Sequence, residues 1–322
     1  MPEHQTMHIR EQLPGDYEAI AHIVATIYPE NAETAAEIEY FDQHRATNCR
    51  WQRFVAEENG QIVGMASFEQ FAWIYHPHKF HLSVEVLPAH QRLGTGRALY
   101  QQLLSALAPY QPVCLRTRVR EDNTAGLHFA AGRGFVEEER TWESRLAPAG
   151  FDFTPYQYAF DRLVQQGITL STVADLASDP QRNEKLYHLA RAATQGEPSV
   201  EPLTPPNKEQ YLTDSLHNPN CLPDAWFIAL DGDHYVGESS LWRMQAHENE
   251  LDVGFTGVRP EYRGRGIALA LKLRTIAYAQ AHGITRLVTF NSSLNQPMLA
   301  INERLGFEKQ PAWIGLRKDL AS

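Results

Sequence analysis

The sequence predicts an α/β (α+β) fold built from two similar domains, each a mixed, mostly antiparallel twisted sheet flanked by helices. Two observations support this prediction. Three separate features occur twice at nearly the same spacing, which indicates an internal duplication. Within each copy, two strands that read as a hairpin precede a strand–helix–strand crossover, an order typical of a mixed sheet covered by helices.

The spacing between the repeated features is 172 or 173 residues. VEVLPAHQRLGTGRAL around Gly94 corresponds to FTGVRPEYRGRGIALAL around Gly266, 172 residues later. The dipeptide Gly-Phe at Gly134 returns at Gly306 with the same spacing, and QIVGMASFE returns as HYVGESSLW 173 residues later. Three features that agree on one offset make two copies of one domain the simplest interpretation.

The copies meet in a region without clear periodicity. We expect an N-terminal domain at residues 1–147, a linker at 148–166 and a C-terminal domain at 167–322. The linker contains PAGFDFTPYQ, which is rich in proline and glycine, although FDRLVQQ can form a short helix there. A proline-rich stretch from Gly196 to Pro223 reads either as a lid or as a solvated insertion without function.

Each expected element follows from a local pattern. A strand at 8–11 precedes an amphipathic helix that begins near Asp16, which can cap it. Asn59-Gly60 and Asp231-Gly232 are typical of hairpin turns. Apolar residues at i, i+4, i+7 and i+8, starting from Leu99 and Leu269, predict the helix after each central strand. In chain order, the other expected strands lie at 54–57, 62–68, 82–87 and 113–119, and at 226–230, 235–241, 251–258 and 287–290.

The composition excludes several classes of protein. Hydrophobic residues make up 43% and charged residues 21%, which excludes wholesale disorder. No apolar run is long enough to span a membrane and the first residues lack a signal-peptide core, so we expect a cytoplasmic protein. Cys49, Cys114 and Cys221 have no CxxC spacing, which excludes a cysteine-built zinc site. A formal net charge of −10 argues against nucleic-acid binding and slightly favours a cationic small-molecule partner; monomer and homodimer both stay open.

Two glycine-rich turns carry the chemical prediction. QRLGTG (Gln91–Gly96) and RGRGIA (Arg263–Ala268) each lie between a strand and a helix. Small residues let a ligand approach the backbone and the first helical N–H groups are unpaired, so each turn can bind a pyrophosphate. A plain structural turn and a dinucleotide-binding turn are the alternatives, but RPEYR separates the strand from the glycines in a way the latter does not. Positive charge is added by His90, Arg92, Arg97, Arg259, Arg263 and Arg265.

Both turns fit Q/R-x-x-G-x-G/A, and the chain therefore resembles a tandem protein of the GNAT superfamily, the acetyl-CoA-dependent N-acetyltransferases. TGVRPEYRGRGIALALK followed by NSSLNQPMLAINERLGF matches most specifically. The resemblance implies that acetyl-CoA binds through its pyrophosphate, that its pantetheine arm follows the preceding strand, and that no metal is required. The cofactor-binding residues it implies are Val258, Arg259, Arg263, Gly264, Arg265, Gly266, Ile267, Ala268, Asn295 and Asn302, with Val86, Leu87, Gln91, Arg92, Leu93, Gly94, Thr95, Gly96 and Asn123 in the first copy.

The resemblance also favours the second copy as the catalyst. Transfer to an amine needs a base, and many GNAT enzymes place a carboxylate eleven residues before the Q/R of the signature. That position holds Asp252 in the second copy, with Glu250 as a substitute, but Phe80 in the first. Alternation would put Asp252 on one strand face with Thr256 and Val258. We therefore expect acetyl transfer to an amine of an unidentified small molecule, chiefly in the C-terminal domain, whereas the N-terminal domain resembles a degenerate copy.

The family's usual acid, a tyrosine four residues before the Gly of Gly-Phe, is missing, because Asn302 and Ala130 occupy those positions. The thiolate would then leave with a proton from water, from the amine or from another residue. Asn123 and Asn295 either bind the pantetheine arm or cap the following helix. A non-catalytic CoA-binding or regulatory protein stays the alternative function.

Two aromatic and histidine-rich groups have other interpretations. His76, His78 and His81 could ligate a metal, but without a carboxylate or cysteine beside them an aromatic strand edge is favoured. The large aromatic residues Trp226, Trp242 and Tyr211 line an acceptor pocket or belong to the core, and the core is favoured.

Overall fold

The structure is a computed structural model that describes residues 7–320, and its contacts divide the chain into two compact units. Unit 1 takes the residues up to Glu139 together with those from Trp313 onward, and unit 2 is Arg140–Ala312. Each unit contains one copy of the repeat. The division differs from the expected boundaries at 147 and 167, because the last strand of the chain belongs to unit 1.

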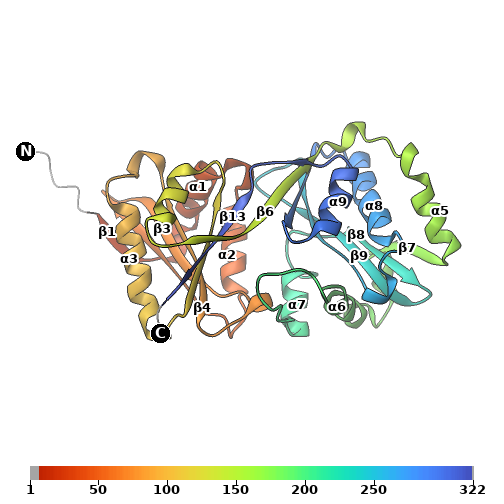
Figure 1. Cartoon of the computed structure of the whole chain (residues 1–322), viewed down its shortest axis with the longest axis horizontal. Helices are drawn as coiled ribbons and strands as arrows, with labels where there is room; N and C mark the ends of the chain where they lie inside the picture. Colours follow the sequence, from red (N-terminus) through yellow and green to blue (C-terminus); the bar gives the residue numbers. More distant parts are fainter. Residues whose placement is uncertain (1–6, 321–322) are drawn as a thin grey trace, which may run out of the picture. The chain divides into compact units, whose positions relative to one another are not determined.

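Unit 1 is a mixed sheet between two layers of helices (Figure 1). Helices α1 and α2 cover one face, through a core cluster that includes Ile20, Ile38 and Met65. Helix α3 covers the other face, where Leu99 packs on Gly64. The strands run in the order β1 (His8–Glu11), β2 (Trp51–Glu58), β3 (Gln61–Glu69), β4 (Lys79–Val86), β5 (Cys114–Arg120) and β13 (Trp313–Asp319), and the helices are α1 (Tyr17–Ile27), α2 (Ala35–Gln43), α3 (Thr95–Leu107) and α4 (Thr124–Ala131).

Unit 2 repeats this layered arrangement. Helices α8 and α5 pack on one face of its sheet and α6 and α7 on the other (Figure 1). Helix α5 lies in the expected linker but contributes Ala159 and Leu163 to the core, so this segment is part of unit 2. The strand order is β6 (Val136–Leu146), β11 (Arg286–Ser292), β10 (Glu250–Val258), β9 (His234–Arg243), β8 (Cys221–Asp231) and β7 (Ile168–Thr172), with β12 (Glu308–Lys309) on β6; the helices are α5 (Gln157–Gln165), α6 (Arg182–Ala193), α7 (Lys208–Asp214), α8 (Ile267–Ala281) and α9 (Gln296–Arg304).

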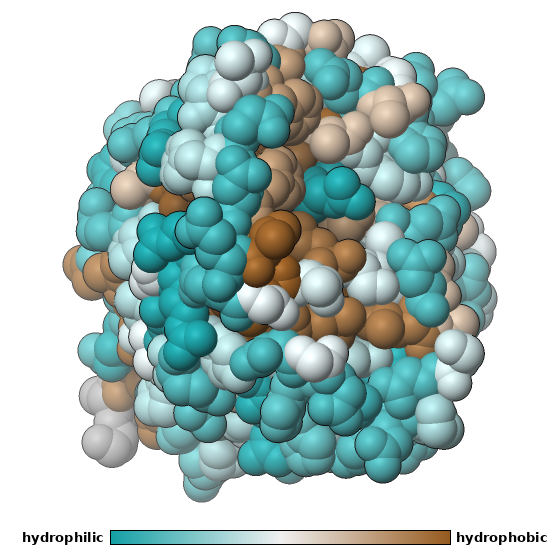
Figure 2. All heavy atoms as spheres, turned by 90° about the vertical axis from the view of Figure 1, so that its right-hand side faces the viewer, coloured by the Kyte–Doolittle hydropathy of each residue, from teal (hydrophilic) through white to brown (hydrophobic). Residues whose placement is uncertain are grey.

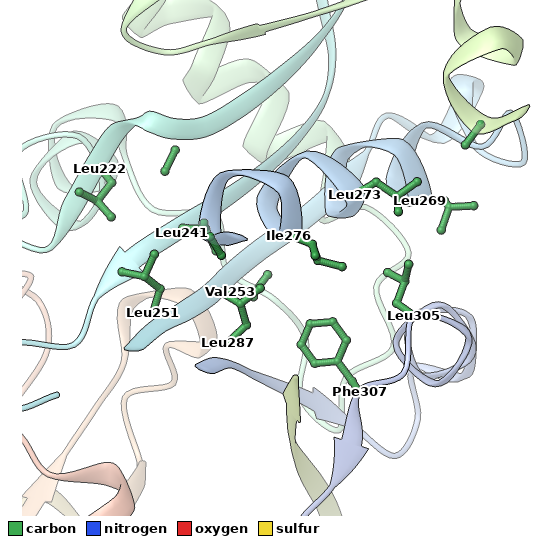
Figure 3. Close-up of a cluster of buried hydrophobic side chains, with 13 residues drawn as sticks. Leu222, Leu241, Leu251, Val253, Leu269, Leu273, Ile276, Leu287, Leu305 and Phe307 are labelled. Carbon is green, nitrogen blue, oxygen red and sulfur yellow. The ribbon is translucent and has the colours of Figure 1, made fainter. Parts of the chain in front are cut away.

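A cluster of buried apolar side chains fixes α8 on the sheet of unit 2. Leu273 and Ile276 of α8 share this cluster with Leu241 and Val253 of the strands, and Leu305 and Phe307 lie on its other side (Figure 3). Because α8 begins at the second glycine turn, this packing also fixes the position of the turn.

In both units two parallel strands separate after three residue pairs. Strand β4 pairs with β5 only from Lys79 to His81, and β10 pairs with β11 only from Glu250 to Asp252. Beyond these pairs, no further strand pairing joins the facing edges of the two strands among the described residues. The second strand of each pair is held from its far side, β5 by all seven residues of β13 and β11 by the last six residues of β6.

A bulge in β10 makes the predicted alternation of that strand wrong. The register with β9 shifts between Val253 and Thr256. As a result Val253 and Val258 both pack in clusters with residues of α8, although they lie an odd number of positions apart, five. Asp252 and Val258 therefore lie on opposite faces, because the extra residue reverses the alternation.

Of two features predicted from short sequence motifs, the hairpin turn at Asn59-Gly60 is present but the helix cap at Asp16 is not. The Asn59-Gly60 turn is confirmed, with φ angles of 51° and 78° that suit a type I′ hairpin. Asp16 stands at the N-cap of α1 without capping it, because its carboxylate accepts hydrogen bonds from Arg10 and from the backbone of Leu13.

The surface of the protein is mixed in character. On the face drawn in Figure 2, hydrophilic side chains surround a band of hydrophobic ones. Among residues 7–320 we find no helix with the length and apolar character needed to span a membrane.

The support that β13 gives to β5 can be tested at Ile314, which is 3% exposed and pairs with Val119. Ile314→Ala should lower the free energy of unfolding of unit 1 by about 2–5 kcal/mol, because it removes buried apolar volume. Amide hydrogen exchange should accelerate along β5. Val136→Ala, at an exposed side chain, is the control. Unchanged exchange in β5 after Ile314→Ala would contradict this role of β13.

Candidate active site

The glycine turns of the two units share one geometry. Gln91 Nε2 donates to the carbonyl of Val86 at 2.9 Å, and Arg263 Nε donates to the carbonyl of Val258 at 3.1 Å. Each side chain therefore ties the turn to the last residue of the preceding strand. Glutamine and arginine can both serve at this position because both carry a side-chain N–H donor. Gly94 and Gly266 stand at the N-caps of α3 and α8 with φ of 101° and 88°.

The amide groups that open both helices are available for a ligand. In each helix, the first backbone N–H group that finds an acceptor belongs to Ala98 in unit 1 and to Ala270 in unit 2. Each donates to the carbonyl of the glycine at the N-cap. The N–H groups of the three preceding residues have no partner among the described residues. Because these groups sit at the positive end of the helix dipole, they favour an anion.

The arginines of the second turn chiefly shape the backbone. Arg259 Nε donates to the carbonyl of Tyr235 at 2.7 Å, and Arg263 Nη2 donates to the carbonyls of Ala193 and Gln195 at 2.8 and 2.7 Å. Arg265 donates to the carbonyl of Glu261 at 3.1 Å. Their charge remains near the turn, but their hydrogen bonds tie it to neighbouring segments.

A cavity of 480 Å³ fills the space between the separating strands of unit 1. It brings together six of the residues predicted to bind the cofactor there: Val86, Gln91, Arg92, Gly94, Gly96 and Asn123. Leu87, Leu93 and Thr95 are not among its lining residues. Thr95 is buried and Leu93 is 68% exposed.

The matching cavity of unit 2 has 300 Å³ and lies between β10 and β11. It brings together Asp252 and Asn295 from the prediction and adds Lys272, Thr289 and Asn291. Glu250 and Asn302 are not among its lining residues, and neither are the other residues predicted to bind the cofactor in the second copy, Val258, Arg259, Arg263, Gly264, Arg265, Gly266, Ile267 and Ala268.

Asp252 and Lys272 are the two opposed charges of this cavity. The Oδ1 atom of Asp252 and the Nζ atom of Lys272 are both buried without a hydrogen-bond partner. Burial raises the pKa of Asp252 and lowers the pKa of Lys272, and the attraction between the two charges partly offsets both shifts. Each group can therefore hold or release a proton near neutral pH, although no hydrogen bond or ion pair joins the two among the described residues.

The other predicted polar residues have structural partners. Glu250 forms an ion pair with Arg286 at 2.7 Å. Asn302 is buried and donates to Asn291 Oδ1 at 2.6 Å, while its own Oδ1 has no partner. Asn123 and Asn295 cap α4 and α9, because their side chains accept hydrogen bonds from backbone N–H groups three residues on.

Counting eleven residues back from Gln91 leads to Phe80, a fully buried core residue. Strand pairing gives a different counterpart for Asp252. Asp252 is the third and last residue of β10 that pairs with β11, and His81 is the third and last residue of β4 that pairs with β5. The counterpart of Asp252 in unit 1 is therefore His81. The bulge of β10 accounts for the difference of one residue, since no register shift occurs between β3 and β4.

A further cavity of 610 Å³ lies in the proline-rich stretch of unit 2, between Arg191 and Pro205. Glu197 lines both this cavity and the one that contains Asp252. Burial raises the pKa of Glu197, and the positive charge of Arg263 opposes that shift. A carboxylate between two cavities can orient an ammonium group.

Sequence reasoning missed Glu85, Lys272 and Glu197. Lys272 follows the apolar run IALAL at the start of α8, which was the signal that the sequence offered for its burial. The histidine-rich segment has its own partners, since the N–H of His78 donates to His76 Nδ1 at 3.1 Å. We find no cluster of metal-ligating side chains within residues 7–320. Trp226 is buried and donates to Glu238 at 3.0 Å, as expected of a core residue.

Known proteins resemble this chain over both copies. The family described as Acetyltransferase (GNAT) family matches at residues 17–135 and 183–307. The mycothiol acetyltransferase of Streptomyces bingchenggensis is 26% identical over 267 residues, which cover 82% of this chain and 79% of the relative.

Solved structures support the fold. A tandem GNAT protein from the clavulanic acid biosynthesis pathway superposes with a TM-score of 0.76 at 16% identity, covering 98% of this chain and 99% of that one. A GCN5-related N-acetyltransferase from Sphaerobacter thermophilus superposes with a TM-score of 0.68 at 19% identity, covering 97% and 95%. At these identities the likeness concerns the fold alone.

The coupling between Asp252 and Lys272 can be measured by a double-mutant cycle. Lys272→Met should lower the free energy of unfolding by about 3–5 kcal/mol at neutral pH, because it leaves a buried carboxylate without its opposing charge. Adding Asp252→Asn should recover much of that loss in chemical denaturation. Arg274→Met, at an exposed position of the same helix, is the control. Equal losses in the single and double variants would contradict the coupling.

Proposed function

The chain belongs to the acetyltransferase (GNAT) family, and we propose that it moves an acetyl group from acetyl-CoA to an amine of a small-molecule acceptor, chiefly in unit 2. The observation that carries the proposal is the unpartnered oxygen of Asp252, which faces a cavity where two strands separate. The name of the relatives, mycothiol acetyltransferase, supports a small-molecule acceptor.

Acetyl-CoA, as the donor, fits the unpaired groups of the cleft. The free amides at the start of α8 suit its pyrophosphate. The free edges of β10 and β11 suit the amides of its pantetheine arm, because unpaired backbone groups need partners. The bulge between Val253 and Thr256 interrupts the ladder at the level of the cavity, where a backbone N–H can polarise the thioester carbonyl.

The buried pair supplies the proton transfers. Asp252 takes a proton from the attacking amine as the nitrogen–carbon bond forms. As the carbon–sulfur bond breaks, protonated Lys272 gives a proton to the thiolate and takes the place of the family's missing tyrosine. Asp252 then releases its proton to solvent and Lys272 takes one from solvent, which restores both groups. The net change is one proton moved from the amine to the thiol.

The acceptor enters beside Glu197 in this proposal. Glu197 lines both the 610 Å³ cavity and the cavity that contains Asp252. Its carboxylate can therefore hold a second ammonium group of the acceptor while the reacting amine faces Asp252. The net charge of −10 further favours a cationic acceptor.

Asp252→Asn should lower kcat for amine-dependent thiol release from acetyl-CoA by about 10²–10⁴-fold, because the base is lost. The wild-type rate should fall toward acid pH as Asp252 is protonated and toward alkaline pH as Lys272 loses its proton. Asp233→Asn, whose side chain is 92% exposed, is the control. Acetyl-CoA binding without thiol release for every amine tested would favour a non-catalytic CoA-binding protein and overturn the proposal.

Glu197→Gln should raise KM for a diamine about 10-fold or more, with little change for a monoamine of similar length, because hydrogen bonds to charged groups stabilise by about 1.5–3 kcal/mol. Steady-state kinetics with the paired amines would measure this difference. Equal changes in KM for both amines would contradict the role of Glu197.

A further inference from the structure

We propose that unit 1 holds a second acetyl-transfer centre of its own, in which Glu85 is the general base, Tyr28 is the acid for the leaving thiolate, and a small primary amine is the acceptor. The inference rests on the proposed function for its donor, acetyl-CoA. It departs from the expectation that this copy lacks an acidic residue on its central strand.

The cavity of unit 1 reaches both faces of the sheet. Val86 pairs with Gly64, which packs against Leu99 of α3, whereas Glu85 pairs with Met65, which packs in the cluster of α1. Neighbouring strand residues point to opposite faces, and both Glu85 and Val86 line the cavity. The glycine turn lines the same cavity. A donor held by the turn can therefore extend toward the α1 face.

Glu85 is placed as a base on that face. Its carboxylate accepts a hydrogen bond from Ser83 Oγ at 2.5 Å and forms no ion pair with any described residue. Burial raises its pKa to about 7; the Ser83 hydrogen bond and the charge of Arg53 on β2 oppose the rise, and Glu69 on β3 adds to it. A base with a pKa near the working pH removes protons effectively.

Tyr28 is placed as the acid. It follows the last residue of α1, lines the cavity and rests against Trp313, with ring centroids 4.9 Å apart. Asn123 Nδ2 donates to its hydroxyl oxygen at 3.4 Å, which leaves the hydroxyl hydrogen free to point into the cavity. Burial and the nearby charge of Glu85 raise the pKa of Tyr28 to about 12, so the phenol keeps its proton until a thiolate forms.

The transfer balances without another reagent. The neutral amine attacks the thioester carbonyl, the nitrogen–carbon bond forms, and Glu85 takes the amine proton. The carbon–sulfur bond then breaks and the thiolate takes the phenolic proton of Tyr28. Transfer of the proton from Glu85 to the phenolate restores both residues and completes formation of the amide and the free thiol.

The two centres differ in where the base lies. Glu85 lies six positions before Gln91, and Gly257 lies six positions before Arg263, so Gly257 is the counterpart of Glu85 in unit 2. By strand pairing, the counterpart of Asp252 in unit 1 is His81. Glu85 thus lies four residues nearer to the turn than the position that Asp252 occupies in unit 2. Different placement of the base gives the two centres different amine preferences.

The test uses the full-length chain with Asp252→Asn as background, and it follows amine-dependent thiol release across a panel of small primary amines. We expect residual turnover with an amine profile unlike that of the wild type. Adding Glu85→Gln should lower it by about 100-fold and remove the part of its pH profile with a midpoint near 7. Adding Tyr28→Phe should lower kcat while KM for acetyl-CoA stays constant. Glu18→Gln, at an exposed position of α1, is the control.

The outcomes separate this inference from the proposed function. An active wild type whose Asp252→Asn variant is inert, or a residual activity that Glu85→Gln leaves unchanged, would overturn the inference alone. Activity that Asp252→Asn leaves at the wild-type rate for every amine, and that Glu85→Gln removes, would support it and overturn the assignment of Asp252. A wild type inert toward every amine would overturn both. Circular dichroism and acetyl-CoA titration of each variant exclude a loss of folding as the cause.

Discussion

The separation of two parallel strands after three residue pairs is the constraint on which both units depend. Hydrogen bonding between β4 and β5, and between β10 and β11, stops where the clefts begin. Backbone groups beyond that point need partners, because an unpaired buried polar group is costly. The glycine turns add free amides at the helix starts next to these edges. A ligand with several amide and phosphate groups can satisfy both sets at once.

The duplicated fold leaves the chemistry of each cleft free to diverge. At equivalent helix positions unit 2 carries Lys272 and unit 1 carries Tyr100. At equivalent strand positions unit 2 carries Asp252 and unit 1 carries His81. The backbone geometry of the turns is kept, since it depends on glycines and on one hydrogen bond to the strand. The charged groups inside each cavity are not constrained by the fold in this way.

The sequence predicted those features that depend on neighbouring residues. The turns at Gly94 and Gly266 and the hairpin at Asn59-Gly60 follow from local backbone preferences. The pairing of β13 with β5 joins residues about two hundred positions apart, and no local pattern records it. The bulge of β10 inserts one residue, which displaced the count that led to Phe80. Lys272 has the appearance of a surface residue until the packing of α8 is known.

The strand arrangement has a consequence for the order in which the protein matures. During synthesis the N-terminal half emerges from the ribosome first and would ordinarily fold first. Here its sheet stays one strand short until Trp313–Asp319 has been made, so β5 lacks its main neighbour while all of unit 2 is translated. An exposed strand edge of this kind invites wrong pairing in the nascent chain. The sheet of unit 1 therefore stays open at β5 until β13 has emerged from the ribosome.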